Sequence, residues 1–439
     1  MTANEFKRRR RALMRMMEPE SIAILPAAPI SIRNRDVHYP YRPDSDFYYL
    51  TGFAEPEAVA VLIPGREQAE YVLFCRERDE KKERWDGPVA GQRGVVEQYG
   101  AEDSFPIGDL DDILPRMLEQ CRRVYYAMGC NTELDRRMSE WINRVRAKGR
   151  NGVHGPVEFI ALDHYLHELR LFKSRSELKA MHTAAAISAA AHKRAMHNCR
   201  PGMTEYRLEA EILHECASLG ARAQAYTPIV GGGANACVLH YVENSSKLQD
   251  GDLVLIDAGC EYDYYASDIT RTFPVGGRFS VAQRELYELV LAAQKAALKK
   301  IKPGNHWDDP HQAAVRTITK GLVELKILKG TSRSVSKLIR EEKYKPFYMH
   351  RTGHWLGMDV HDVGDYKVDG AWRLLEPGMC MTVEPGLYIA PDVRGVAKRW
   401  RGIGIRIEDD AVVSKEGHEV LSAAVPKKVD EIEALMAEG

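Results

Sequence analysis

The sequence predicts a two-domain α/β protein whose second domain is built from two similar halves. Its 439 residues exceed the roughly 250–300 residues over which a single hydrophobic core keeps growing, so two domains are expected. Short apolar runs of strand length mark the first part of the chain, and long helices alternate with short strands in the second part. Two helices followed by a short strand that ends on an acid occur twice in that second part.

Charge and composition argue against two kinds of partner. Lys and Arg (62) nearly balance Asp and Glu (63), so no overall field attracts nucleic acid or an anionic membrane. The one basic run, residues 7–11, lies in a segment where Phe6, Leu13 and Met17 share a helix face, and we interpret it as a solvated helix surface. No stretch approaches the roughly 18 apolar residues that a membrane span needs.

Cysteine usage and the N-terminus predict the cellular compartment. Eight cysteines are scattered without C-x-x-C spacing, and the basic N-terminus lacks the apolar core and cleavage site of a signal peptide. In a chain of this length such cysteines are expected to be reduced and mostly buried. The sequence therefore predicts a cytoplasmic protein that does not use sulfur chemistry.

The first domain is predicted from strand-like and helical runs. Three apolar runs have strand length and composition, at residues 58–65, 70–75 and 124–129. Helical periodicity follows over 136–148, and composition changes after a charged amphipathic segment at 163–176. We place the boundary near Lys173, which gives an N-terminal α/β domain over 1–172 and a second domain over 173–439.

The second domain begins with two pairs of helices. The alanine-rich segment 176–199 stops at Arg-Pro-Gly, and Thr204 is expected to cap the helix that follows. The same order recurs at 281–301, which stops at Lys-Pro-Gly, and at 311–325. Two helical pairs with matching stop signals indicate a duplicated unit.

The duplication continues into the strands behind these helices. DGDLVLIDAG (250–259) aligns with EPGMCMTVEPG (376–386) so that Asp257 meets Glu384. Both segments contain a turn glycine, a short apolar strand, an acid and a second glycine. Two halves closing on each other would bring the two acids together at a central cleft.

Two further acids belong to the same pattern. Asp268 follows Asp257 by eleven residues, and a turn through Glu261–Asp263 would set these aspartates side by side in a hairpin. Glu408 ends an alternating strand, as Glu384 ends its own. Taken singly, each acid could instead cap a turn or pair with a nearby arginine, but the four together in this order argue for one site.

A metal centre is the physical solution for four buried acids. Desolvating each charge costs several kcal/mol, and two divalent cations balance four carboxylates. One histidine from residues 349–362 would complete an oxygen-rich ligand set that suits Mn²⁺, Mg²⁺ or Fe²⁺ better than zinc. Two such ions about 3.5–4 Å apart can share and activate a bridging hydroxide for hydrolysis.

These segments resemble one family. LIDAG, SDITRTF, MHRTGHWLGMDVHDVG, EPGMCMTVEPGLYI and GIGIRIEDD together are similar to the motifs of the Xaa-Pro aminopeptidases of the bacterial aminopeptidase P type. The resemblance covers nearly the whole chain, including 39–59 and 238–244. It implies an N-terminal α/β domain like that of creatinase, a catalytic domain of the pita-bread fold, and two manganese ions per subunit. The metal ligands that it implies are Asp257, Asp268, His354, Glu384 and Glu408.

The resemblance also assigns roles to the other polar residues. His361 contacts substrate and assists proton movement, His350 lines the proline pocket, and His240 supports the carbonyl or the transition state. Glu384 both binds metal and accepts a proton. Arg406 is expected to orient Glu408 or another acid through paired hydrogen bonds, unless it is an ordinary surface arginine.

The expected activity is removal of the N-terminal residue from peptides with proline in second position, by a metal-bridging hydroxide. A prolidase, which hydrolyses only Xaa-Pro dipeptides, shares all five ligands and is the nearest alternative. A non-catalytic binding protein of the same fold would have lost ligands, and creatinase needs no metal. The resemblance also implies a homo-oligomer, a dimer or tetramer, in which Trp85 enters a neighbouring cleft or packs in its own core.

Overall fold

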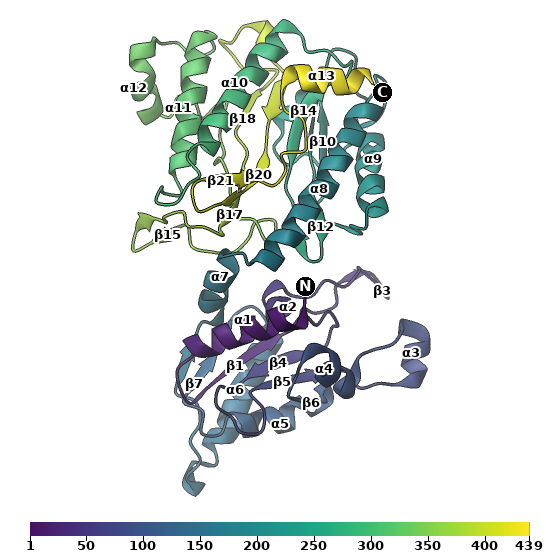
Figure 1. Cartoon of the computed structure of the whole chain (residues 1–439), viewed down its shortest axis with the longest axis vertical. Helices are drawn as coiled ribbons and strands as arrows, with labels where there is room; N and C mark the ends of the chain where they lie inside the picture. Colours follow the sequence, from purple (N-terminus) through teal and green to yellow (C-terminus); the bar gives the residue numbers. More distant parts are fainter. Residues whose placement is uncertain (439) are drawn as a thin grey trace. The chain divides into compact units, whose positions relative to one another are not determined.

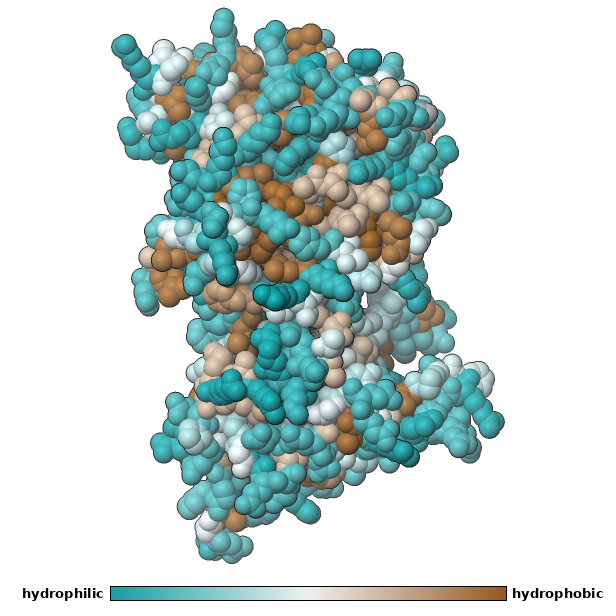
Figure 2. Space-filling model, viewed as in Figure 1, coloured by the Kyte–Doolittle hydropathy of each residue, from teal (hydrophilic) through white to brown (hydrophobic). Residues whose placement is uncertain are grey.

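A computed structural model describes residues 1–438 of the chain, which divides into two compact units, Met1–Arg170 and Leu171–Gly439 (Figure 1). The division lies close to Lys173, where composition changes along the sequence. Each unit has its own hydrophobic core. Among the described residues, no helix is long and apolar enough to cross a membrane. The face in Figure 2 is mostly hydrophilic, with apolar side chains in scattered patches.

The first unit is built on a six-stranded mixed sheet with the strand order β6-β5-β4-β1-β7-β8. β1 pairs antiparallel with β4 and parallel with β7. Every residue of β4 and β5 is buried, which explains why both are uninterrupted apolar runs in the sequence. The strands are β1 (Ser21–Pro26), β4 (Val59–Leu62), β5 (Tyr71–Cys75), β6 (Asp103–Pro106), β7 (Arg123–Tyr125) and β8 (Glu158–Ile160).

The helix expected at 136–148 is α6, and it begins earlier, because the side chain of Asn131 caps it by accepting the N–H of Leu134. A small hairpin joins β2 to β3. The remaining elements of this unit are α1 (Ala3–Met16), β2 (Ile32–Asn34), β3 (Val37–His38), α2 (Ser45–Thr51), α3 (Glu80–Asp86), α4 (Gly91–Tyr99), α5 (Leu110–Met117), α6 (Thr132–Arg146) and α7 (Leu162–Leu171), with short 3₁₀ turns at Ile107–Asp109 and Gly149–Asn151.

The basic run in α1 is only partly solvated. Arg9 and Arg10 are 1% and 4% exposed. Arg9 donates to the carbonyl of Tyr49 (3.1 Å) and lies 4.1 Å from the centre of its ring. Arg10 donates to the carbonyl of Leu50 (2.8 Å) and lies 4.0 Å from the ring of Tyr71. The interpretation of the run as a solvated surface is therefore wrong for these two residues, because helix carbonyls and tyrosine rings take the place of water.

The second unit contains the two expected pairs of long helices. Both pairs begin with a capping box, Ser174 with Glu177 and Ser280 with Gln283. Thr204 occupies the predicted N-cap of α9, but its hydroxyl makes no capping hydrogen bond. The helices of this unit are α8 (Arg175–Asn198), α9 (Glu205–Ser218), α10 (Val281–Leu298), α11 (Asp309–Glu324), α12 (Val335–Arg340) and α13 (Val429–Ala437).

Short antiparallel sheets fill the space between these helices. Their orders are β10-β11-β14, β13-β12-β9, β17-β20-β21, β18-β19 and β15-β16. The strands are β9 (Ala223–Gln224), β10 (Ile229–Gly232), β11 (Leu253–Asp257), β12 (Cys260–Tyr262), β13 (Tyr265–Ala266), β14 (Thr270–Pro274), β15 (Lys367–Val368), β16 (Ala371–Trp372), β17 (Cys380–Val383), β18 (Gly386–Ile389), β19 (Ile403–Arg406), β20 (Asp409–Val413) and β21 (His418–Val420). One hydrophobic core includes residues from the strands of both halves.

The two halves place their acids at matching strand ends. β11 ends on Asp257 and pairs with β14, which starts just after Asp268. β17 ends just before Glu384 and pairs with β20, which starts just after Glu408. The strands at each pair of acids therefore run antiparallel, as the duplicated sequence pattern predicts.

The turn between the two aspartates differs slightly from the expected one. Asp263 and Tyr264 form it, with φ of 53° and 66°. Glu261 still pairs with Ala266 in the β12–β13 ladder, so the turn cannot begin at Glu261. The β12–β13 hairpin thus lies between the two aspartates and returns the chain towards Asp257.

Candidate active site and metal centre

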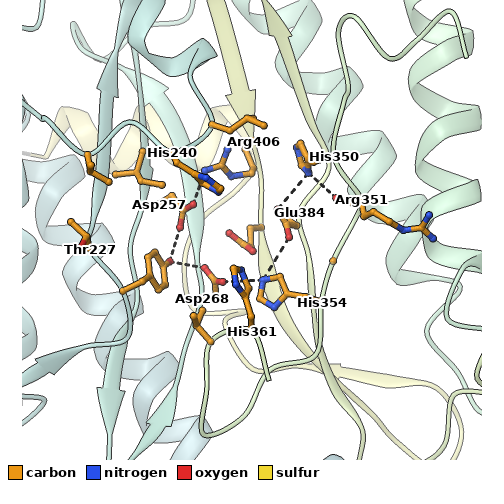
Figure 3. Close-up of a pocket in the computed structure, with 17 residues that line it drawn as sticks. Thr227, His240, Asp257, Asp268, His350, Arg351, His354, His361, Glu384 and Arg406 are labelled. Carbon is orange, nitrogen blue, oxygen red and sulfur yellow. Dashed lines mark hydrogen bonds and ion pairs between the residues drawn. The ribbon is translucent and has the colours of Figure 1, made fainter. Parts of the chain in front are cut away.

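A cavity of about 530 Å³ in the second unit brings the candidate site residues together (Figure 3). It lies where the acid-bearing strand ends of the two halves meet. All nine residues singled out in the sequence line it: His240, Asp257, Asp268, His350, His354, His361, Glu384, Arg406 and Glu408.

The carboxylates reach the cavity because each lies at the end of a strand or one to two residues beyond it. Asp257 is the last residue of β11, after four buried apolar residues. Asp268 lies between β13 and β14, Glu384 directly after β17, and Glu408 between β19 and β20. His354 comes from the loop before β15, where its neighbour Trp355 forms an isolated bridge to Met381.

Three of the expected ligands already lie at metal-binding spacing. One ligand atom from each of Asp268, His354 and Glu408 lies within 4.8 Å of the others. His354 Nε2 is 3.3 Å from Asp268 Oδ2 and 3.7 Å from Glu384 Oε1. Its Nδ1 is 2.9 Å from the carbonyl oxygen of Trp355, which can only accept, so Nδ1 carries the proton. Nε2 therefore faces the carboxylates, as a metal-binding histidine does.

The pKa values show the charge problem of this pocket. Burial, and the neighbouring acids after it, raises the pKa of Glu408 well above its usual range. Burial also raises the pKa of Asp257, and it raises that of Glu384 to about 7. Burial acts in the same direction on Asp268, but the hydrogen bond and charge of His354 lower the pKa of this carboxyl. Burial lowers the pKa of His354, but the hydrogen bond to Asp268 and the charge of Glu384 outweigh it and raise the pKa to about 9.

Arg406 is a buried site residue and not a surface arginine. It is 4% exposed, and its Nη2 lies 2.6 Å from Asp257 Oδ2. It also donates to the hydroxyls of Thr270 (3.1 Å) and Tyr388 (2.9 Å). The acid that it contacts is Asp257 and not Glu408, and it does so through one hydrogen bond and not the expected pair, because its other donors meet Thr270 and Tyr388.

Three hydroxyl groups at the site were not predicted. The hydroxyl of Tyr226 lies 2.6 Å from Asp257 Oδ1 and 2.5 Å from Asp268 Oδ1. Thr270 donates to Glu408 Oε2 (2.6 Å). Tyr388 lies between Arg406 and His350 (2.9 Å to His350 Nε2). Of the three, only Thr270 could have been found from the sequence, because it lies two residues after the candidate ligand Asp268.

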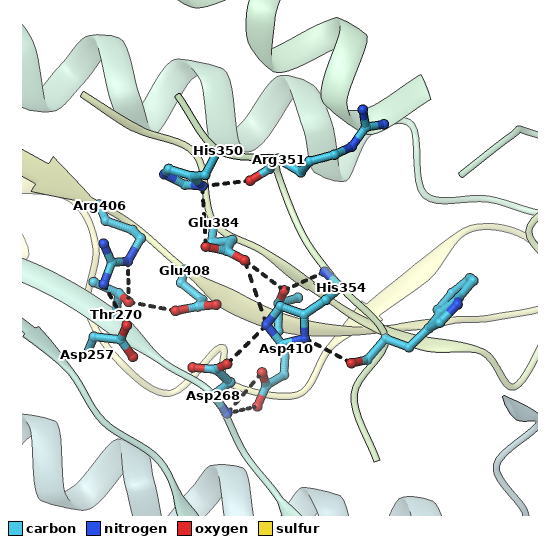
Figure 4. Close-up of polar contacts among 12 residues, drawn as sticks. Asp257, Asp268, Thr270, His350, Arg351, His354, Glu384, Arg406, Glu408 and Asp410 are labelled. Atoms are coloured by element: carbon cyan, nitrogen blue, oxygen red, sulfur yellow. Dashed lines mark hydrogen bonds and ion pairs between the residues drawn. The ribbon is translucent and has the colours of Figure 1, made fainter. Parts of the chain in front are cut away.

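The backbone of the site is also held by buried carboxylates (Figure 4). Asp410 accepts the N–H of Asp268 at 3.2 and 3.1 Å through its two oxygens. Asp409 forms a fully buried ion pair with Arg271 (2.7 Å) and a second with Lys427. Arg271 in turn donates to the carbonyl of Glu408. The acids that follow Glu408 therefore fix the strands on which the ligands stand.

The other histidines stand on different sides of the cavity. His350 Nδ1 donates to the carbonyl of Arg351 (2.7 Å) and lies 3.6 Å from Glu384 Oε2. Burial, and then the charge of Arg406, lowers the pKa of His350 to about 3. The ring of His361 meets that of His354 edge-on at 4.4 Å, and burial lowers the pKa of His361. Both rings are thus neutral at physiological pH.

The donor set fits divalent cations that prefer oxygen ligands. Four carboxylates and one imidazole nitrogen face one cavity, and Arg406 forms an ion pair with one of the four, Asp257. Burial, together with the neighbouring acids, raises the pKa of three of the four carboxyl groups and so disfavours their ionised forms. A bound cation would remove this repulsion and compete with those protons.

Comparison with known sequences supports the same assignment. Metallopeptidase family M24 matches residues 179–415, and the aminopeptidase P N-terminal domain matches residues 6–126. The chain belongs to metallopeptidase family M24. As an M24 metallopeptidase it is a peptide-bond hydrolase with a metal-binding site. The two-domain fold with a pita-bread catalytic domain, expected from the sequence, is confirmed.

Close relatives of this M24 chain span its full length. It is 62% identical to an aminopeptidase of Pseudomonas aeruginosa of known structure, with a TM-score of 0.98, and covers 98% of that chain. Proline aminopeptidase P II of Yersinia pestis is 49% identical with a TM-score of 0.96, each chain being fully covered. Xaa-Pro aminopeptidase of Escherichia coli is 48% identical over 437 residues, which are 99% of this chain and 98% of that protein.

Proposed function

We propose that this protein is a Xaa-Pro aminopeptidase, which removes the N-terminal residue of a peptide when proline is second. The observation that carries the proposal is the convergence of Asp257, Asp268, Glu384 and Glu408 with His354 Nε2 in one buried cavity. Full-length similarity to enzymes named Xaa-Pro aminopeptidase supports the substrate.

Those five residues would hold the two divalent cations of the proposed centre, and Asp268 and Glu408 would serve both. Manganese is the proposed metal, because the ligand set is rich in oxygen and has a single nitrogen. A structure of E. coli aminopeptidase P is named as zinc-substituted, which supports zinc as a replacement in that enzyme. Bound cations would supply activation of water and polarisation of the scissile carbonyl.

The protein's own groups have separate tasks in this proposal. Glu384, which lies 3.7 Å from His354 Nε2 and faces the cavity, accepts a proton. His361 and His240 face the substrate carbonyl and steady the charge that develops there. His350 lines the pocket for the proline ring, with its orientation fixed by Tyr388. Arg406 holds Asp257.

The chemistry of proline favours a dedicated site. An Xaa-Pro bond is a tertiary amide, so the leaving nitrogen carries no N–H and is crowded by the ring. A cleft that relied on hydrogen bonding to that N–H would bind it poorly. Carbonyl polarisation from one side and a fixed ring pocket on the other do not need this hydrogen bond.

A prolidase remains the second candidate, since it would use the same ligands. The deciding assay compares hydrolysis of an Xaa-Pro dipeptide with that of an Xaa-Pro-Yaa tripeptide, each with and without Mn²⁺. An aminopeptidase cleaves the tripeptide efficiently. Cleavage restricted to the dipeptide would reassign the protein as a prolidase, and no cleavage of either by the manganese-loaded protein would reject both.

Homo-oligomerisation, as a dimer or tetramer, is also proposed. Trp85 lies on α3 and is 90% exposed, so it does not pack in a core of its own unit. Light scattering of the parent chain and of Trp85→Ala tests whether this side chain stabilises an assembly. A cytoplasmic location also remains a prediction from the sequence.

A further inference from the structure

A buried ion pair lies beside the loop that carries His361. Lys173 Nζ is 2.8 Å from Asp362 Oδ2, and each side chain is only 1% exposed. The two residues are 189 positions apart in the sequence. Neither lines the cavity, and the proposed chemistry uses neither. Replacing a buried ion pair by an apolar pair of equal volume often costs no stability, and in some proteins such an ion pair instead enforces a specific arrangement.

Asp362 closes the loop on itself. Its N–H donates to the carbonyl of Trp355 (2.9 Å), and its Oδ1 lies 3.4 Å from the N–H of Asp359. Oδ2 lies against Gly357, where an added Cβ would be only 2.0 Å from this oxygen and 2.9 Å from the Cε of Lys173. The loop between His354 and Asp362 therefore packs around the ion pair. His361 directly precedes Asp362, whose carboxylate is held by Lys173.

Lys173 is fixed on the other side by the strand that leads to Glu384. Its N–H donates to the carbonyl of Gly378 (2.9 Å), and its neighbour Phe172 forms a bridge with Met379. Met379 directly precedes β17, which ends beside Glu384. One short segment thus joins the base of the His361 loop to the strand of a proposed ligand.

We propose that Lys173 and Asp362 are positioning residues for His361, which hold its imidazole at the distance from the metal centre that turnover requires. This inference rests on the proposed role of His361 in catalysis. The ion pair sets the position of the loop, while the five ligands hold the metals without it. Losing the pair therefore changes turnover and leaves metal binding intact.

The experiment is a double-mutant cycle on the manganese-loaded full chain with an Xaa-Pro-Yaa tripeptide. Asp362→Asn, Lys173→Met and the neutral pair Lys173→Met/Asp362→Leu are each made with and without His361→Ala. The neutral pair leaves no unpaired buried charge, so it keeps the test meaningful if a single variant fails to fold. Leu322→Ala, a cavity-forming change in the core at α11, controls for loss of stability alone. The measured quantities are kcat, KM, bound manganese and Tm.

We expect kcat to fall about tenfold or more in each variant, because a catalytic group misplaced by about 1 Å can cost on the order of 100-fold. KM and metal content stay near those of the parent. In the His361→Ala background the same substitutions cause little further loss, since groups that act through one another are not additive. Leu322→Ala lowers Tm and leaves kcat unchanged.

Equal losses of kcat in both backgrounds would overturn the inference, as would full kcat in the folded neutral pair. Loss of manganese from the variants would overturn it too, because the pair would then support the ligands and not His361. Unchanged kcat in His361→Ala itself would remove the catalytic role on which the inference rests. Absence of Xaa-Pro hydrolysis in the parent would instead reject the proposed function.

Discussion

Removing the metal ions should destabilise the second unit more at pH 8 than at pH 5. In the metal-free protein the pKa of Glu384 rises from its ordinary 4.5 to about 7, so between these values the folded chain holds a proton that the unfolded chain has released. Stability then falls as the pH rises through this window. His354, with a pKa of about 9 against an ordinary 6.5, acts in the same direction between those two values.

The size of the effect follows from the shift at Glu384. One pKa unit corresponds to about 1.4 kcal/mol, so the step from 4.5 to about 7 amounts to on the order of 3 kcal/mol. For a unit of this size that is roughly 6 °C in Tm. A bound cation keeps the ligand ionised at both pH values, so the metal-loaded protein does not show this loss.

The quantity to measure is the difference between metal-loaded and chelated protein. Burial lowers the pKa of His192 and of His311 to about 4, so both of these groups make the fold more stable as the pH rises from 4 to 6.5. They titrate with and without metal, and they cancel in the difference. Urea unfolding at pH 5 and pH 8, with saturating Mn²⁺ and with chelator, gives the four values that are needed.

A matched variant isolates the carboxyl group. Glu384→Gln has no titrating group at this position. Without metal, the variant should therefore be more stable relative to the parent at pH 8 than it is at pH 5. A metal-dependent stabilisation that is equal at the two pH values, or larger at pH 5, would refute the reasoning. It would mean that protons and metal ions do not compete for one cluster formed by these acids.

Three further results are expected from single substitutions. Replacing any proposed ligand by alanine should abolish peptidase activity, with Asp268→Ala and Glu408→Ala losing both metals and the others retaining part of the metal; full activity would remove that residue from the site. His361→Ala and His240→Ala should keep their metal and lose most of their turnover, roughly 100-fold or more, which kinetics and metal analysis of each purified variant decide. Asp409→Asn should lower the free energy of unfolding by on the order of 2 kcal/mol at pH 7, because Arg271 and Lys427 lower the pKa of this buried acid from 3.8 to about 2; the deficit should shrink as the pH falls from 4 towards 2, and an equal deficit throughout would contradict this origin.

The strands that carry the candidate ligands could be predicted because each combines two simple signals. In LVLID, buried apolar residues require a strand, and an acid at its end must meet a partner or a cation. The repeat of that pattern at Glu384 placed the two acids in matching positions without any knowledge of packing. Asp268 follows Asp257 by only eleven residues, and this short separation predicted that the two lie close together. The exact position of the turn between them depended on the pairing of Glu261 with Ala266.

The residues that were missed depend on contacts between distant segments. Tyr226 reaches both aspartates only because β10 pairs with β11, setting Ile229 opposite Asp257. No local pattern marks a tyrosine whose hydroxyl will meet two carboxylates. Arg10 was misread for the same reason, since the tyrosine under its guanidinium lies 61 residues away at Tyr71. Composition gives the charge of such side chains, and only the tertiary structure gives their partners.

The origin of the ligands in two halves has a consequence for the order of folding. Asp257 and Asp268 belong to the first half, and Glu384 and Glu408 to the second. Either half alone offers a cation at most two carboxylates, so tight metal binding has to wait until the halves dock. Cations bound at the proposed centre would therefore stabilise the contact between the halves, slowing their separation more than they speed formation of either one. Separation of the two halves would in turn take the proposed centre apart and release its ions.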